Sequence, residues 1–150
     1  MYKFILIALF IVCGNMSALS QETKTIVNDK TAKARLLGVH RLSLQWISWD
    51  YFGKARITER RGILNVSGEQ KSRGGADYLR INGKIVRVDA KQFIFDGKIV
   101  TKVSSINDGE PCVREGEMTF KITGNRKYWR LQEMLNPCTN VETDYVDIFF

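Results

Sequence analysis

The sequence has 150 residues, 44% of them hydrophobic and 26% charged, and its 23 lysines and arginines outnumber 16 aspartates and glutamates to leave a net charge of +7. A chain of this length and composition makes one domain with a substantial core, which excludes a disordered protein, a repeat array and a coiled coil. One histidine and three cysteines argue against a histidine-rich metal site and exclude a disulfide-dense small scaffold.

Residues 1–20 have the layout of a secretory signal peptide. Lys3 supplies a positive charge, residues 4–12 form an unbroken apolar run, and Ala18-Leu19-Ser20 places small residues before a cleavage point after Ser20. The apolar run is well short of the roughly 20 residues that cross a bilayer. We therefore expect an exported protein, periplasmic or extracellular, without a transmembrane span.

The three cysteines divide between the signal peptide and the mature chain. Cys13 leaves open a lipoprotein signal cleaved before a lipidated cysteine, although Val12 stands where such a site prefers a small residue. Cys112 and Cys138 remain after cleavage, in a compartment that permits disulfides. A bond between them would stabilise the fold by about 3.5 kcal/mol in the loop-entropy model, and we expect it to be structural.

The mature chain begins with a polar leader, residues 21–35, which has no aromatic side chain and which we expect to be mobile. The β domain, residues 36–150, consists of short runs rich in valine, isoleucine and aromatics, separated by turns that contain glycine. The predicted strands are 40–50, 54–60, 63–70, 77–81, 84–90, 92–95, 98–105, 117–123, 126–134 and 143–149. This pattern predicts an all-β fold, a single antiparallel meander or barrel of about 8–10 short strands with one disulfide.

Three dipeptides that contain glycine are predicted as hairpin turns: Asn82-Gly83, Asp96-Gly97 and Gly124-Asn125. The last turn pairs Phe120 with Trp129 and sorts apolar side chains onto one face and polar ones onto the other. In that register the two mature cysteines fall within one residue of opposition. We therefore expect the disulfide to staple the base of this hairpin.

The C-terminal strand places Val146, Ile148 and Phe150 on one face. An exposed apolar chain end would be an aggregation hazard. We therefore expect this strand to be paired in the sheet, with these three side chains in the core.

The sequence contains no recognisable catalytic or metal-binding motif. His40 is the only imidazole, and it alternates with Leu42, Leu44 and Trp46, which favours the end of an inward-facing row over a catalytic base. A nucleophile elbow, a zinc-protease motif, an EF-hand loop and a phosphate-binding glycine loop are all missing. We predict that the protein is not an enzyme and uses no cofactor or metal.

The segment 42–52 carries the densest group of aromatics, with Trp46, Trp49 and Tyr51 close together. Two interpretations are open. The one that we favour is that these side chains fill the core, since a β domain of this size needs large aromatics. In the other, they and Trp129 contact a small apolar ligand or a glycan.

Basic residues are spread along the predicted strands rather than clustered, and several take alternate, outward positions. Export argues against a nucleic-acid partner, although the sign of the charge would suit one. We expect instead a solvated basic face that is attracted to anionic envelope polymers or lipid headgroups.

The C-terminal third contains the motifs Glu110-Pro-Cys-Val-Arg-Glu-Gly, Arg126-Lys-Tyr-Trp-Arg-Leu-Gln-Glu-Met-Leu-Asn-Pro-Cys and Asp144-Tyr-Val-Asp-Ile-Phe-Phe. These motifs resemble segments of a group of small uncharacterised exported bacterial proteins, and the likeness runs from about Leu37 to the end. The resemblance implies secretion and a plan with two cysteines, and it implies no activity. The similarity to lipocalin-like and avidin-like barrels is one of architecture only.

From these features we expect a secreted, monomeric or weakly associating β-barrel module that binds a small apolar or glycan ligand. Two alternatives stay open: a structural or envelope-associated interaction protein without a ligand pocket, and an inhibitor of an acidic secreted hydrolase. A ligand-sized cavity inside the barrel would favour the binding module, and a packed interior would favour the interaction protein.

Overall fold

The computed structural model describes residues 22–150, so the predicted signal peptide, its cleavage point and Cys13 lie outside the described residues. Nine strands, one α-helix and one short 3-10 helix follow one another along the described chain. They are β1 (Ile26–Val27), α1 (Lys30–Leu36), β2 (Gly38–Leu44), β3 (Gly53–Arg60), β4 (Ile63–Lys71), β5 (Tyr78–Val88), β6 (Gln92–Lys102), η1 (Asn107–Gly109), β7 (Cys112–Lys121), β8 (Tyr128–Leu131) and β9 (Val146–Phe149).

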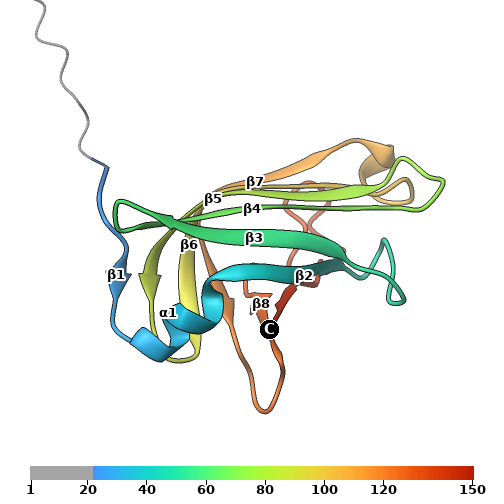
Figure 1. Ribbon diagram of the computed structural model, residues 1–150. Coiled ribbons are helices and arrows are strands. Elements are labelled where there is room, and N and C mark those ends of the chain that lie inside the picture. Colours follow the sequence, from blue (N-terminus) through green and yellow to red (C-terminus); the bar gives the residue numbers. More distant parts are fainter. Residues whose placement is uncertain (1–21) are drawn as a thin grey trace, which may run out of the picture.

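Strands β2 to β9 form a closed antiparallel barrel (Figure 1). Each strand pairs with the next one in the sequence, and β9 returns to pair with β2, so the sheet closes on itself. The short strand β1 runs parallel to the end of β5. The predicted all-β antiparallel barrel with one disulfide is confirmed.

The loops fall into two groups, one at each end of the barrel, because successive strands alternate in direction. The α1 end consists of helix α1 with its capping residue Asp29, and of the turns 61–62, 89–91 and 122–127. The disulfide end consists of the loops 45–52, 72–77, 103–111 and 132–145, the last of which carries Cys138. Helix α1 and strand β1 mark the α1 end at the left of Figure 1.

The barrel interior is packed with apolar side chains. Phe93, Phe95, Phe120 and Trp129 are buried there, and their rings contact one another with centroid distances of 5.0, 5.8 and 6.2 Å. Four pockets of residues 22–150 open at the barrel ends or on the outer face. The interior of the described barrel is therefore a core, and a ligand would have to bind outside it.

Two of the predicted hairpin turns are wrong, because Asn82-Gly83 and Asp96-Gly97 lie inside long strands. Strands β5 and β6 run straight through these dipeptides, and Gly83 lies opposite Gly97. A Cβ atom added to either glycine would lie 2.7 Å from the Phe95 ring. The two glycines therefore make room for an aromatic ring against the strands, which is a strand role of glycine and not a turn role.

The third predicted turn, Gly124-Asn125, does connect β7 to β8, but the register differs from the predicted one by two residues. Phe120 pairs with Leu131 rather than with Trp129. A shift of two residues keeps each side chain on its predicted face. Phe120, Leu131 and Trp129 are accordingly all buried.

The polar leader contributes β1 and α1 to the end of the barrel. Asp29 caps the helix, since its carboxylate accepts a hydrogen bond from the Ala32 N–H at 2.7 Å. Ala32 and Leu36 are buried, and the two ring nitrogens of His40 lie 2.7 Å from Leu36 O and 3.0 Å from Phe149 O. A helix with two buried residues carries too narrow an apolar stripe to be predicted from the sequence.

Strand β9 closes the barrel with two fully buried side chains. Val146 pairs with Leu44, and Ile148 pairs with Trp129. The predicted pairing of the C-terminal strand is confirmed. The prediction that Phe150 joins the core is wrong, because this side chain lies just beyond the strand and is 37% exposed.

Replacing Ile148 by alanine should lower the free energy of unfolding by about 2–5 kcal/mol, because the change opens a cavity at the strand that closes the barrel. Phe150→Ala removes a larger side chain, but one that is partly in water, and we expect a smaller loss. Urea denaturation of both variants and the parent protein measures the two effects. Equal losses would show that the chain end contributes as much to the stability as the barrel seam, which would contradict this prediction.

Candidate functional site

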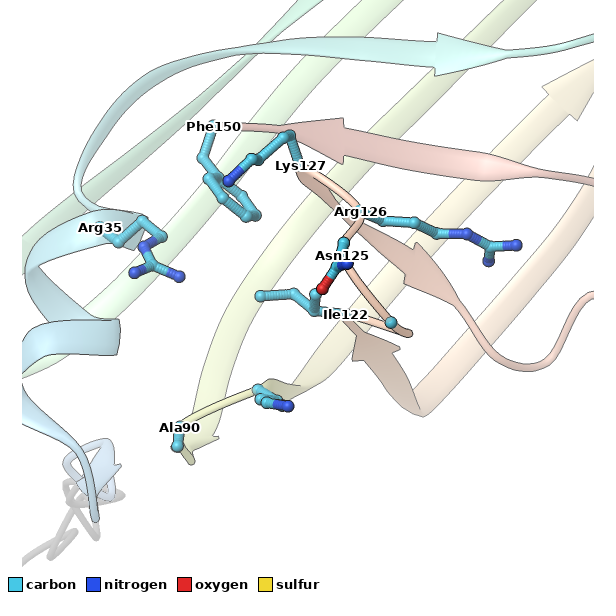
Figure 2. A pocket seen from close by; sticks show the side chains of 9 residues that line it. Arg35, Ala90, Ile122, Asn125, Arg126, Lys127 and Phe150 are labelled. Carbon is cyan, nitrogen blue, oxygen red and sulfur yellow. The ribbon is translucent and has the colours of Figure 1, made fainter.

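A pocket of about 730 Å³ opens at the α1 end of the barrel (Figure 2). It is bordered by helix α1, the turn between β5 and β6, the hairpin between β7 and β8, and the last residue of the sequence. Its lining residues are Arg35, Ala90, Lys91, Ile122, Gly124, Asn125, Arg126, Lys127 and Phe150. Segments that are far apart in the sequence thus meet at one site.

Four of the lining residues are basic and none of the nine is acidic. Within residues 22–150, Arg35, Lys91, Arg126 and Lys127 form no ion pair, either with an acidic side chain or with the carboxylate that ends the sequence. Figure 2 shows Arg35 and Lys127 beside the pocket, whereas the guanidinium of Arg126 extends away from it. We refer to this site as the cationic pocket.

The acidic residue closest to Lys91 in the sequence, Asp89, is engaged with other partners. Its carboxylate accepts hydrogen bonds from Asn28 Nδ2 at 2.7 Å and from Arg87 Nε at 3.0 Å. The hydrogen bond from Asn28 is the main cause that lowers the pKa of Asp89 below its usual value, and Gln92 and Arg87 lower it further. The negative charge of Asp89 is therefore paired with Arg87 and not with Lys91.

Arg35 and Phe150 separate the cationic pocket from a second, smaller pocket. The Arg35 guanidinium lies 4.9 Å from the centroid of the Phe150 ring, which is a cation–π contact. The smaller pocket, of about 420 Å³, is lined by Arg35, Val39, His40, Arg41, Phe149 and Phe150. The α1 end thus offers basic groups and apolar surface side by side.

The predicted ligand-contacting aromatics do not come together. The predicted strand 40–50 ends at Leu44, and Trp46, Trp49 and Tyr51 lie in the loop between β2 and β3 at the disulfide end. Trp46 is 42% exposed and Trp49 is 63% exposed, so the favoured interpretation that they fill the core is wrong. Trp129 does fill the core, where the loop aromatics do not contact it.

Hydrogen bonds hold the loop 45–52 in place. Trp46 Nε1 donates to Asp144 Oδ1 at 3.0 Å, and the Tyr51 hydroxyl accepts from the Arg73 N–H at 2.9 Å. The buried Gln70 side chain in β4 donates to the Tyr51 carbonyl at 3.1 Å. The two exposed indoles are therefore carried by a braced loop.

The predicted disulfide between Cys112 and Cys138 is confirmed. It ties the segment 132–145 to the start of β7, rather than stapling two strands of one hairpin. Beside it Arg114 and Asp144 form an ion pair at 2.9 Å whose side chains are 5% and 1% exposed. Nη1 of Arg114 has no hydrogen-bond partner in the described chain, while Nη2 and Nε donate to Asp144 and to loop carbonyls. These contacts give the disulfide end a rigid interior.

The geometry of the described residues offers a site for electrostatic binding. No three histidine, cysteine, aspartate or glutamate side chains in residues 22–150 come together as a group that could hold a metal ion. No helix in that range has the length and apolar character to cross a bilayer. Arginine and lysine side chains gathered without a carboxylate can bind phosphate or carboxylate groups through charge-assisted hydrogen bonds.

The cationic pocket was not predicted, because its basic residues are spread along the sequence. Arg35, Lys91, Arg126 and Lys127 lie in three separate segments of the sequence, each outside the barrel strands. The signal that could have found them is the alternation of loops between the two ends of an antiparallel barrel, which places 89–91 and 122–127 at the same end.

Comparison with known proteins gives a family and no activity. Residues 24–150 match the model of the PM1083 family. A protein of Pasteurella multocida (strain Pm70), described as uncharacterized protein PM1083, is 46% identical over 116 residues, which cover 77% of this chain and 74% of that protein. No solved structure shows significant similarity. The resemblance to a group of uncharacterised proteins is confirmed at this level.

Asp144→Ala should lower the free energy of unfolding by about 3–5 kcal/mol, because it leaves the buried Arg114 charge without its partner. The double variant Arg114→Met/Asp144→Leu removes both charges and should recover most of that loss. Chemical denaturation of the two variants measures the difference. If the free energy of unfolding of the single variant falls no more than that of the double variant, the ion pair does not stabilise the disulfide end.

Proposed function

The chain belongs to the PM1083 family, and from its cationic pocket we propose that it is an exported, non-catalytic β-barrel module that binds an anionic component of the bacterial envelope. The observation that carries the proposal is the set of four basic side chains around one pocket with no acidic residue in its lining. Phosphate and carboxylate groups are the chemistry that such a pocket recognises.

Two features of the chain support export. Residues 1–20 have the order of a signal peptide, with a positive charge, an apolar run and small residues before the cleavage point. The Cys112–Cys138 disulfide is of a kind that persists in oxidising compartments.

The charges of the lining residues favour the binding of an anion in the pocket. Arg35, Lys91 and Lys127 line one pocket and form no ion pair within residues 22–150. An anion that enters the pocket gains charge-assisted hydrogen bonds that the folded state alone offers. Such a ligand stabilises the folded protein by mass action, so binding should be visible as a rise in melting temperature.

The packed interior supports binding at a barrel end over binding inside the barrel. Phe93, Phe120 and Trp129 occupy the space that a lipocalin-like cavity would need. An acidic secreted hydrolase would present carboxylates to the same cationic pocket. The inhibitor hypothesis therefore shares the chemistry of this proposal and becomes one outcome of its test.

A second candidate function rests on the two exposed indoles of the loop 45–52. Trp46 and Trp49 expose large apolar surface, while the hydrogen bond from Trp46 to Asp144 fixes one of the two rings. A flat indole face on a braced loop is a surface on which a sugar ring can stack, and little side-chain entropy is lost on binding. The loop would thus bind a glycan, at the opposite end from the cationic pocket.

Tripolyphosphate, as a probe of the phosphate chemistry, should raise the melting temperature and bind more weakly as salt concentration rises. Each of Lys91→Gln and Lys127→Gln should weaken binding about tenfold, the effect of losing one hydrogen bond to a charged group. Lys54→Gln makes the same charge change on the outer face of β3 and serves as the control. Equal weakening by all three variants would refute the pocket as the binding site.

Three further probes, namely glucose 6-phosphate, glucose and an acidic hydrolase, distinguish a phosphate ligand from a protein ligand. Glucose 6-phosphate and glucose differ only in the phosphate, and only the first should bind. An acidic hydrolase that displaces tripolyphosphate and loses its activity on binding would identify the protein as an inhibitor.

Oligomers of N-acetylglucosamine should change the tryptophan fluorescence through Trp46 and Trp49 if the loop binds glycans. The Trp46→Ala/Trp49→Ala variant retains only the buried Trp129 and should show no change. Val141→Ala, in the exposed loop at the same end, is the matched control and should respond as the parent does. A response that persists in the double variant would come from Trp129 and would contradict the loop site.

A further inference from the structure

The two ends of the barrel carry opposite charge. The α1 end, as defined above, contains seven basic and two acidic side chains. The disulfide end contains seven acidic side chains and one basic side chain. Although the whole chain has a net charge of +7, an anionic partner is therefore attracted to one end and repelled by the other.

Exposed apolar side chains flank the cationic pocket. Leu37 is 38% exposed, Val39 is 52% exposed and Phe150 is 37% exposed. Val39 and Phe150 line the smaller pocket with Arg35, and Leu37 directly follows helix α1. A soluble polyanion would gain nothing from these apolar groups. A lipid surface, in which charged headgroups lie above hydrocarbon, would contact both the apolar and the basic side chains.

We infer that the partner of the α1 end is the surface of an anionic lipid bilayer. Leu37, Val39 and Phe150 enter the boundary between headgroups and acyl chains, and the basic side chains of the cationic pocket contact the headgroup phosphates. The inference rests on the proposed function, because it uses the cationic pocket as the phosphate site, and it adds the class of partner.

The charge distribution also gives the docked protein a direction. The acidic disulfide end is repelled by an anionic surface, so it faces the water. Trp46 and Trp49 lie at that end and remain accessible, whereas Trp129 lies closer to the bilayer, with its ring centroid 4.5 Å from that of Phe150.

Co-sedimentation with vesicles tests the lipid surface, using protein purified after expression of the full sequence. We expect binding to vesicles of phosphatidylcholine mixed with phosphatidylglycerol, no binding to phosphatidylcholine alone, and loss of binding at high salt. Leu37→Gln/Val39→Thr should weaken vesicle binding about tenfold and leave tripolyphosphate binding unchanged. Leu135→Gln/Val141→Thr removes exposed apolar groups from the disulfide end and is the matched control.

Lipids with brominated acyl chains report the orientation, because bromine quenches tryptophans close to the bilayer. The remaining Trp129 signal of a Trp46→Phe/Trp49→Phe variant should be quenched more strongly than the signal of the parent. Equal vesicle binding by the apolar variant and the parent, or stronger quenching of Trp46 and Trp49, would overturn the inference. Tripolyphosphate binding without vesicle binding would also overturn it and leave the proposed function standing, and loss of both would overturn both.

Discussion

The pairing of β9 with β2 and β8 is the constraint on which the rest of the structure depends, because it closes the barrel. The four-residue strand is held from both sides. Val146 and Ile148 are buried inside, and on the outer face Asp147, 1% exposed, accepts two hydrogen bonds from Arg130 at 2.8 and 2.7 Å. The Arg130 guanidinium lies 4.1 Å from the Tyr145 ring, and its hydrogen bonds to Asp147 raise its pKa above the usual value. A bidentate ion pair shielded from water thus holds the seam.

Local patterning predicted the faces of the strands better than their lengths. Alternation of apolar and polar residues decides which side chains point inward, and this held even where the hairpin register was off by two residues. The predicted strands were too short because Gly83 and Gly97 occur in dipeptides that are typical of turns. Their role in the strands is set by the Phe95 ring and by the strand opposite, and these contacts are not local in sequence. The disulfide was predictable because only two cysteines follow residue 20.

The same two glycine dipeptides explain why the cationic pocket was not predicted. Each wrongly predicted turn reverses the predicted direction of the chain. Loops that follow Asp96-Gly97 are reversed twice and so are predicted at the correct end. The turn that contains Lys91 lies between the two dipeptides, is reversed once, and is therefore predicted at the disulfide end, away from Lys127. Arg35 was missed for a separate reason, since the leader in which it lies contributes the helix α1 to the barrel end. The residues of the site could be recognised as basic, but their convergence required the correct number of strands.

A closed barrel with a filled interior leaves its two ends and its outer wall for contact with partners. The disulfide end is braced by the Cys112–Cys138 bond and by the buried pair of Arg114 and Asp144, so the shape of its loops is set by contacts beneath them. At the α1 end the last residue, Phe150, contacts Arg35 through a cation–π interaction, and the lining of the neighbouring cationic pocket contains no acidic side chain. Evenly distributed basic residues would attract an anionic surface to every face of the protein. The opposite charges of the loops at the two ends favour the orientation in which the α1 end faces an anionic surface.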